Sequence, residues 1–147
     1  MIKTLTRAII YSFFIVAVSF QSIAQTTIIS PAAGGGFEGG TTFAANGWTE
    51  VNTPPVQTNQ WFVGTSATGF TGARCAYVGT ASTNNTYNVN SVTVSHFYRD
   101  VTFPAGQPNI TLSFSWKGYG EGTYDYMRVY LVPTATVPTA GTLLASG

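Results

Sequence analysis

The chain has 147 residues, of which 7% are charged and 14% are aromatic, and its formal net charge is +1 at pH 7. This balance gives no strong basic field to attract nucleic acid or anionic lipid, so neither is an expected partner. The aromatic content is too high for a disordered chain. A length of roughly 120 residues after a leader is enough for one domain with one core.

The first 24 residues have the three parts of a signal peptide. Lys3 and Arg7 give a basic start, an apolar run follows from 8 to 20, and Ser22-Ile23-Ala24 supplies small residues for cleavage. The apolar run is shorter than the ~20 residues of a spanning helix. We therefore expect a signal peptide at 1–24, a domain at 25–147 without a membrane span, and a secreted protein; an N-terminal membrane anchor is the alternative.

The composition after residue 24 is that of an extracellular all-β domain, with few charges and many Gly, Thr, Ser, Asn and aromatic residues. Cys75 is the single cysteine, so no internal disulfide can form. We expect Cys75 to be a small buried hydrophobe, because free cysteines are usually buried. The alternative, a reactive thiol, needs exposure and a cationic neighbour, for which Arg74 is weak support.

Short runs of β-branched and aromatic residues follow one another between Gly, Pro and Asn turns, and no segment of useful length has helical periodicity. The strands expected before the longest pattern are at 26–30, 48–51, 60–64, 73–79 and 92–103, with another at 142–144. Arg99 interrupts the apolar row of its run, which predicts a bulge or a strand end. The polar span 80–90 predicts an exposed loop of the kind that hosts binding. Together these patterns predict an antiparallel β-sandwich or jelly roll.

The clearest pattern lies at 109–132 and predicts a hairpin central to the sheet. Apolar residues alternate with polar ones in both halves, which is the period of a strand with one buried face. Glycines between the halves allow the chain to reverse. The apolar rows are Ile110, Leu112, Phe114 and Trp116 in the first half and Met127, Val129 and Leu131 in the second.

Two acidic residues are candidate metal ligands. Asp125 has the parity of the second apolar row, so we expect it at the covered face, where a carboxylate must be paired, hydrogen-bonded or metal-bound. Glu38 follows Phe37 between two groups of glycines, which lets the backbone fold around a cation. A structural Ca2+ held by Glu38 and Asp125 is one reading. A flexible linker at Glu38, or a glycosidase pair drawn from Glu38, Glu121 and Asp125, is another.

Exposed aromatic side chains form the second candidate site. Tyr119, Tyr124 and Tyr126 cluster at the predicted hairpin, as does Tyr130, and such rings can serve as a stacking platform for sugars. The alternative is that tyrosines on the outer face of a sandwich only reflect β-propensity.

The sequence contains no recognisable catalytic constellation, so a binding or structural module is expected and not an enzyme. His96 is the single histidine, and adjacent strand residues point to opposite faces, which disfavours a triad with Ser95 and Asp100. The sequence stops just after the run at 142–144, and we expect it to be a fragment that lacks the last strands of the sheet.

Several short motifs resemble the choice-of-anchor J and cleaved-adhesin modules of bacterial surface proteins, which are related to MAM-like jelly rolls. The resemblance rests on Phe37-Glu38 with its glycines, Gly47-Trp48, the segment of Trp61, Leu112-Ser113-Phe114 and the run from Tyr124 to Val129. It covers about 36–132. The acidic segment before a Ser-Pro that is usual in these modules is absent near 90–94.

The resemblance implies a secreted jelly-roll module of a multidomain surface protein, often exported by the type IX route, with a cation shared by Glu38 and Asp125. We therefore expect a non-catalytic adhesion or binding module that takes an extracellular glycan or protein ligand at the cell surface. The alternative is a carbohydrate-binding module attached to a secreted hydrolase or peptidase. A spacer without a ligand is the third reading.

Overall fold

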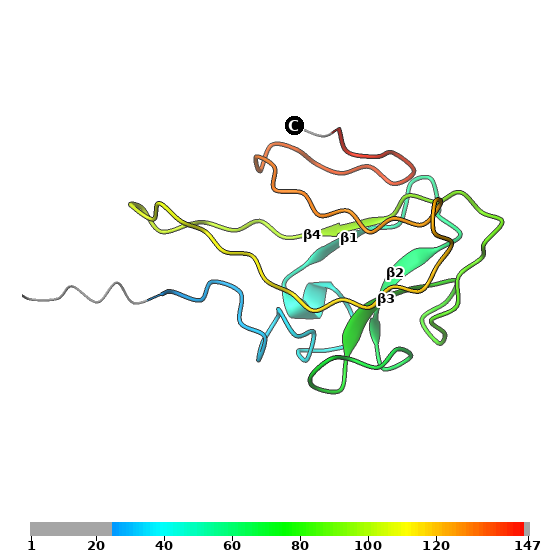
Figure 1. Ribbon diagram of the computed structural model, residues 1–147, viewed down its shortest axis with the longest axis horizontal. Coiled ribbons are helices and arrows are strands. Elements are labelled where there is room, and N and C mark those ends of the chain that lie inside the picture. The colour runs from blue at the N-terminus through cyan, green and yellow to red at the C-terminus, as the bar shows by residue number, and fades with distance from the viewer. Residues whose placement is uncertain (1–24, 146–147) are drawn as a thin grey trace, which may run out of the picture.

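The structure is a computed structural model that describes residues 25–145, so the expected signal peptide lies outside the described residues. Within that range the only helical element is one 3-10 turn, and the strands form two small antiparallel sheets. The chain is therefore all-β, as the sequence predicts. The elements are η1 (Ala44–Asn46), β1 (Thr49–Val51), β2 (Gln60–Gly64), β3 (Cys75–Gly79) and β4 (His96–Tyr98), and Figure 1 shows the two strand pairs at the centre of the molecule.

Three of the predicted strands are confirmed closely. β2 has the bounds 60–64 that the sequence indicates, and it pairs with β3 so that Phe62 lies opposite Tyr77. β1 pairs with β4, with Glu50 opposite Phe97. β1 starts just after Gly47, whose φ of 74° closes the 3-10 turn in the left-handed region that favours glycine.

The core of the described chain is an aromatic cluster centred on Phe97 in β4. The Phe97 ring stacks on Phe43 with centroids 4.9 Å apart and meets Trp61 edge to face at 4.9 Å and Trp48 at 5.3 Å. Phe37 joins at 6.1 Å from Phe97. Phe43 is only 1% exposed. These rings join β4, β2, the residue before β1 and the glycine-rich segment before η1 into one packed unit, because aromatic pairs combine large buried areas with favourable ring geometry.

The hairpin predicted at 109–132 is wrong as a paired structure. The chain does reverse at 119–125 (Figure 1), but no strand is assigned in either half, and the side chains of both apolar rows are exposed. The period of two correctly indicates an extended backbone. A period of two does not provide a partner strand, and among the described residues neither half of the predicted hairpin pairs with one.

Two further expected strands are also absent from the described chain. Residues 26–30 have no ladder pairing and contain a bend at 28–29, and 142–144 have no ladder pairing either. The run at 92–103 contributes only the three residues of β4, which ends immediately before Arg99, where the sequence predicts an interruption. The segment near 142 is still anchored, since the Gly141 amide donates to the Val94 carbonyl at 2.7 Å and Ala140 is buried.

One further feature concerns membranes. In the part of the chain that the structure describes, no helix has the length and apolar character needed to cross a bilayer.

Candidate binding surface at the tyrosine loop

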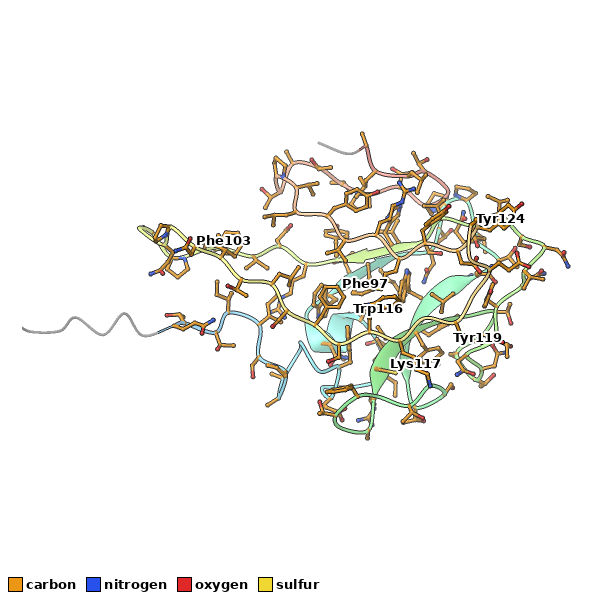
Figure 2. All side chains as sticks on the ribbon, viewed as in Figure 1. Phe97, Phe103, Trp116, Lys117, Tyr119 and Tyr124 are labelled. Carbon is orange, nitrogen blue, oxygen red and sulfur yellow. The ribbon has the colours of Figure 1, made fainter. Side chains whose placement is uncertain are left out.

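Residues 119–126, called here the tyrosine loop, present three exposed aromatic rings. Tyr119 is 98% exposed, Tyr124 77% and Tyr126 67%. In Figure 2, Tyr119 and Tyr124 lie toward one end of the molecule and Phe103 toward the opposite end, with Phe97 between them. The side chains predicted to bind a ligand are therefore accessible to one.

The tyrosine loop is held by Asp125. Its Oδ2 accepts hydrogen bonds from the Tyr87 hydroxyl and from the Glu121 amide, each at 2.7 Å. The amides of Tyr124 and Asp125 both donate to the Glu121 carbonyl at 3.1 Å, which closes the turn. Asp125 thus links the tyrosine loop to the predicted loop at 80–90. It is exposed and does not face a covered sheet, so the parity argument for its burial is wrong, because the strand that would define that face does not form.

The contact between Tyr87 and Asp125 shifts both ionisation equilibria. The hydrogen bond from the Tyr87 hydroxyl, followed by that from the Glu121 amide, lowers the pKa of Asp125 below its ordinary value. The same hydrogen bond to Asp125, with smaller effects of burial and of nearby negative charge, raises the pKa of Tyr87. Near neutral pH the carboxylate is ionised and the phenol is protonated, which is the pairing that the geometry requires.

The base of the 80–90 loop is fixed to β2 by a buried amide. Asn59, 6% exposed, accepts a hydrogen bond from the Asn88 amide at 2.7 Å and donates to the Asn88 carbonyl at 3.0 Å. The Asn59 side chain therefore binds the amide and the carbonyl of Asn88, as a neighbouring strand would. Because Tyr87 is the neighbour of Asn88, a series of contacts runs from the residue before β2 through Tyr87 to Asp125 and the tyrosine loop.

Tyr126 has a defined orientation within the loop. Its hydroxyl donates to the Thr123 carbonyl at 2.5 Å, and the Arg128 guanidinium lies 5.4 Å from its ring centroid. A ring that is held before binding loses less conformational freedom when a ligand arrives. The loop thus combines fixed and free rings, with Arg128 as an accessible hydrogen-bond donor.

Glu38, the other predicted metal ligand, holds a turn. Its Oε1 accepts from the amides of Ala73 and Arg74 at 2.9 and 2.8 Å, and its Oε2 lies 3.7 Å from an Arg74 guanidinium nitrogen. Gly72 beside it has φ of 85°, and a Cβ there would collide with the Glu38 carboxylate. The glycine-rich surroundings therefore fit a carboxylate bound by backbone amides, which stabilises the entry into β3.

The contacts of Glu38 and Asp125 have no residue in common, and they do not show the shared cation site that the resemblance implies. Within residues 25–145 no three His, Cys, Asp or Glu side chains lie close enough together to hold a metal ion. The oxygens that would bind Ca2+ accept hydrogen bonds from amides or a phenol instead. The structural Ca2+ at Glu38 and Asp125 stays a prediction.

The remaining candidate groups have structural partners. His96 Nε2 lies 2.9 Å from the Thr142 carbonyl, and the Ser95 hydroxyl donates to the Asn59 carbonyl at 2.6 Å. Cys75 is half-buried, with its Sγ 3.4 Å from the Ala67 carbonyl. Burial, assisted by the negative charge of Glu38, raises the pKa of the Cys75 thiol, which disfavours the reactive thiolate.

Sequence reasoning missed the buried amides. Asn52 accepts from the Trp61 amide at 3.0 Å and donates to its carbonyl at 3.2 Å, while Gln57 accepts from the Val94 amide at 3.0 Å. Asn46 bonds the segment before η1 in a similar way. Each lies in a polar run that predicts turns, and only its placement beside an expected strand could have drawn attention to it.

Three comparisons with known proteins add no family to this geometry. No protein-family model, no curated protein and no solved structure matches the chain.

Proposed function

We propose that this chain is a secreted, non-catalytic binding module that uses the tyrosine loop to attach to an extracellular ligand, as part of a surface adhesion protein. The proposal includes the resemblance to the choice-of-anchor J and cleaved-adhesin modules, and a complete jelly-roll sandwich as the fold. The observation that carries it is the set of exposed rings at 119, 124 and 126, on a loop whose turn is closed through Asp125.

The arrangement of the loop supports binding by a preorganised surface. Single exposed hydrophobic residues are ordinary on proteins, but three exposed rings within eight residues, on a turn closed by one carboxylate, are a concentration of accessible aromatic area. Tyrosine has few rotatable bonds, so its burial by a ligand costs little side-chain entropy for the area it offers. Asn84, Asn85 and Asn90 of the adjacent loop supply amides that can exchange hydrogen bonds with a polar ligand.

A carbohydrate-binding module is the second candidate, and the same rings favour it. Sugars present faces of C–H groups that pack on aromatic rings and hydroxyls that bond to amides. In that case the module would accompany a hydrolase or peptidase domain. The nature of the ligand distinguishes the adhesion module from the carbohydrate-binding module. A protein ligand favours adhesion, and a glycan alone favours the accessory module.

The test is binding of the purified chain to arrays of glycans and of extracellular matrix proteins. The double variant Tyr119→Ala/Tyr124→Ala should weaken any ligand bound by this surface by about tenfold, which corresponds to about 1.4 kcal/mol for two aromatic contacts. Phe70→Ala is the matched control, because Phe70 is 84% exposed and lies outside the loop. Blank arrays, or an equal loss with the control, would contradict the proposal and favour a spacer.

The structural calcium ion is a separate part of the proposal. If Glu38 and Asp125 share a cation, calcium should raise the melting temperature and a chelator should lower it, because a ligand that binds only the folded state stabilises it. Identical midpoints in calcium and chelator would exclude the ion while leaving the tyrosine surface untouched.

A further inference from the structure

Residues 100–119 have no backbone partner in the described chain, and after the turn at Ala105-Gly106 the part from 108 to 119 is extended. No backbone hydrogen bond within the described residues involves any of them. Their apolar row is open to solvent: Ile110 is 51% exposed, Leu112 65%, Phe114 51% and Trp116 67%. Figure 1 shows the yellow segment as an extended line that ends at the tyrosine loop. An extended strand with free amides and carbonyls and an apolar row is a template for pairing.

The protections that natural proteins place on such edges are missing here. From 101 to 120 the only charged residue is Lys117, and Pro104 and Pro108 lie before the alternating row and not within it. Exposed edges are usually guarded by internal charges, prolines or bulges that prevent pairing with another chain. The segment from Ile110 to Trp116 is therefore open to a second strand along its whole length.

We infer that residues 110–116 pair antiparallel with the same residues of a second copy of the chain, around a two-fold axis at Ser113. This register places Ile110 opposite Trp116 and Leu112 opposite Phe114, so every apolar pair joins a branched aliphatic side chain to an aromatic ring. Such cross-strand pairs are favourable. On the other face, the hydroxyls of Thr111 and Ser115 lie opposite each other and can exchange hydrogen bonds.

Neither the charges nor the symmetry of the contact opposes pairing with a second copy. Lys117 lies opposite Asn109, and the two Lys117 side chains of the dimer are separated by roughly 27 Å, eight residues along the ribbon. That distance exceeds the screening length of about 8 Å at physiological salt. The contact is the same patch on both copies, so it closes after two chains and does not propagate.

The size of the contact predicts a weak and reversible dimer. Two strands with four apolar side chains each bury on the order of 1,000 Å² in total, near the lower bound for a specific interface. The dimer should therefore form with rising concentration, and sedimentation equilibrium of the unaltered chain should show a monomer–dimer equilibrium. Leu112→Lys should shift it at least tenfold toward monomer, because pairing would desolvate two added ammonium groups that lie roughly 7 Å apart along the ribbon.

The register is tested by cysteine cross-linking in the Cys75→Ser background. Ser113→Cys faces its own copy across the axis, where Cα atoms of opposed residues are about 4.5–5.5 Å apart, within the range of a disulfide. Thr111→Cys is the matched control, since its own copy lies roughly 14 Å away. Mild oxidation should give at least ten times more disulfide dimer with Ser113→Cys. A mixture of Thr111→Cys and Ser115→Cys chains should give the mixed dimer.

Two outcomes would overturn the inference. Equal cross-linking of Ser113→Cys and Thr111→Cys would show random encounters. If the unaltered chain stays monomeric at millimolar concentration and sediments like the Leu112→Lys variant, the segment does not pair with a second copy. The second measurement uses the unaltered chain, so it decides the question even if a cysteine variant fails to fold.

Discussion

The region around β1 to β4 and the segment from 100 to 132 share a type of sequence pattern but differ in structure. Both contain alternating apolar and polar residues and several aromatic rings. In the first region the rings meet one another around Phe97 and the strands are paired. In the second, most of the rings are exposed, and the only backbone hydrogen bonds among the described residues are those of the turn at Glu121. Alternation indicates that a segment can be a strand, and a partner at the right distance decides whether it becomes one.

The largest expected difference is in the effect of removing a ring. Phe97→Ala should destabilise the chain by about 3 kcal/mol or more, because it leaves a cavity among Phe43, Trp48 and Trp61. Phe114→Ala, the matched control in the exposed row, should change the free energy of unfolding by less than about 0.5 kcal/mol. Urea unfolding at low protein concentration measures both. Similar values for the two variants would mean that the exposed row is packed in solution.

The second difference concerns buried amides. Asn59→Ala should cost about 2 kcal/mol, because it removes both hydrogen bonds that this buried side chain makes with the backbone of Asn88. The same variant should weaken ligand binding at the tyrosine loop, since Tyr87 would lose its support. Asn85→Ala, on the exposed part of the same loop, is the control and should have little effect on either quantity. Thermal melting and the ligand arrays provide the two readouts.

Glu38 tests whether the glycine-rich segment is part of the packed region. Glu38→Ala should destabilise the chain by about 1.5 kcal/mol, since two backbone amides lose a charge-assisted acceptor. The exposed Glu50→Ala in β1 should stay within about 0.5 kcal/mol. If the loss for Glu38→Ala occurs equally in calcium and in chelator, the carboxylate acts on the amides. A loss confined to the calcium condition would support the shared cation.

The smallest effect is the pH dependence of the tyrosine loop. The pKa of Asp125 is lowered in the folded chain, so its contribution is complete above the unfolded value of about 3.9 and is lost as the pH falls through the folded pKa. Acidification below about pH 4 should therefore release Tyr87, and NMR shifts of the Tyr87 ring would report the change. Asp125→Asn should remove this transition without moving the main unfolding midpoint by more than a few degrees. An unchanged titration in that variant would contradict the assignment.

Part of the candidate binding surface could be predicted from the sequence. The glycines between the two halves of 109–132 indicate a reversal, and Tyr119, Tyr124 and Tyr126 lie there and are exposed. The partner of Asp125 could not be predicted, because Tyr87 is 38 residues away and nothing in its surroundings marks it. The same holds for Glu38, whose acceptor role depends on a turn 35 residues further along.

The sequence by itself determined the all-β class, the bounds of β2, the end of β4 before Arg99 and the exposed polar loop at 80–90. These follow from local physics, namely side-chain alternation, β-branching and the conformational freedom of glycine, which act over a few residues. Tertiary structure alone decided which alternating segments pair, which carboxylates bind amides, and that Asn59 bonds the backbone of Asn88 beside Tyr87. Those outcomes depend on contacts between distant residues, whose free energies compete with the entropy of bringing the chain together, and no local pattern encodes that competition.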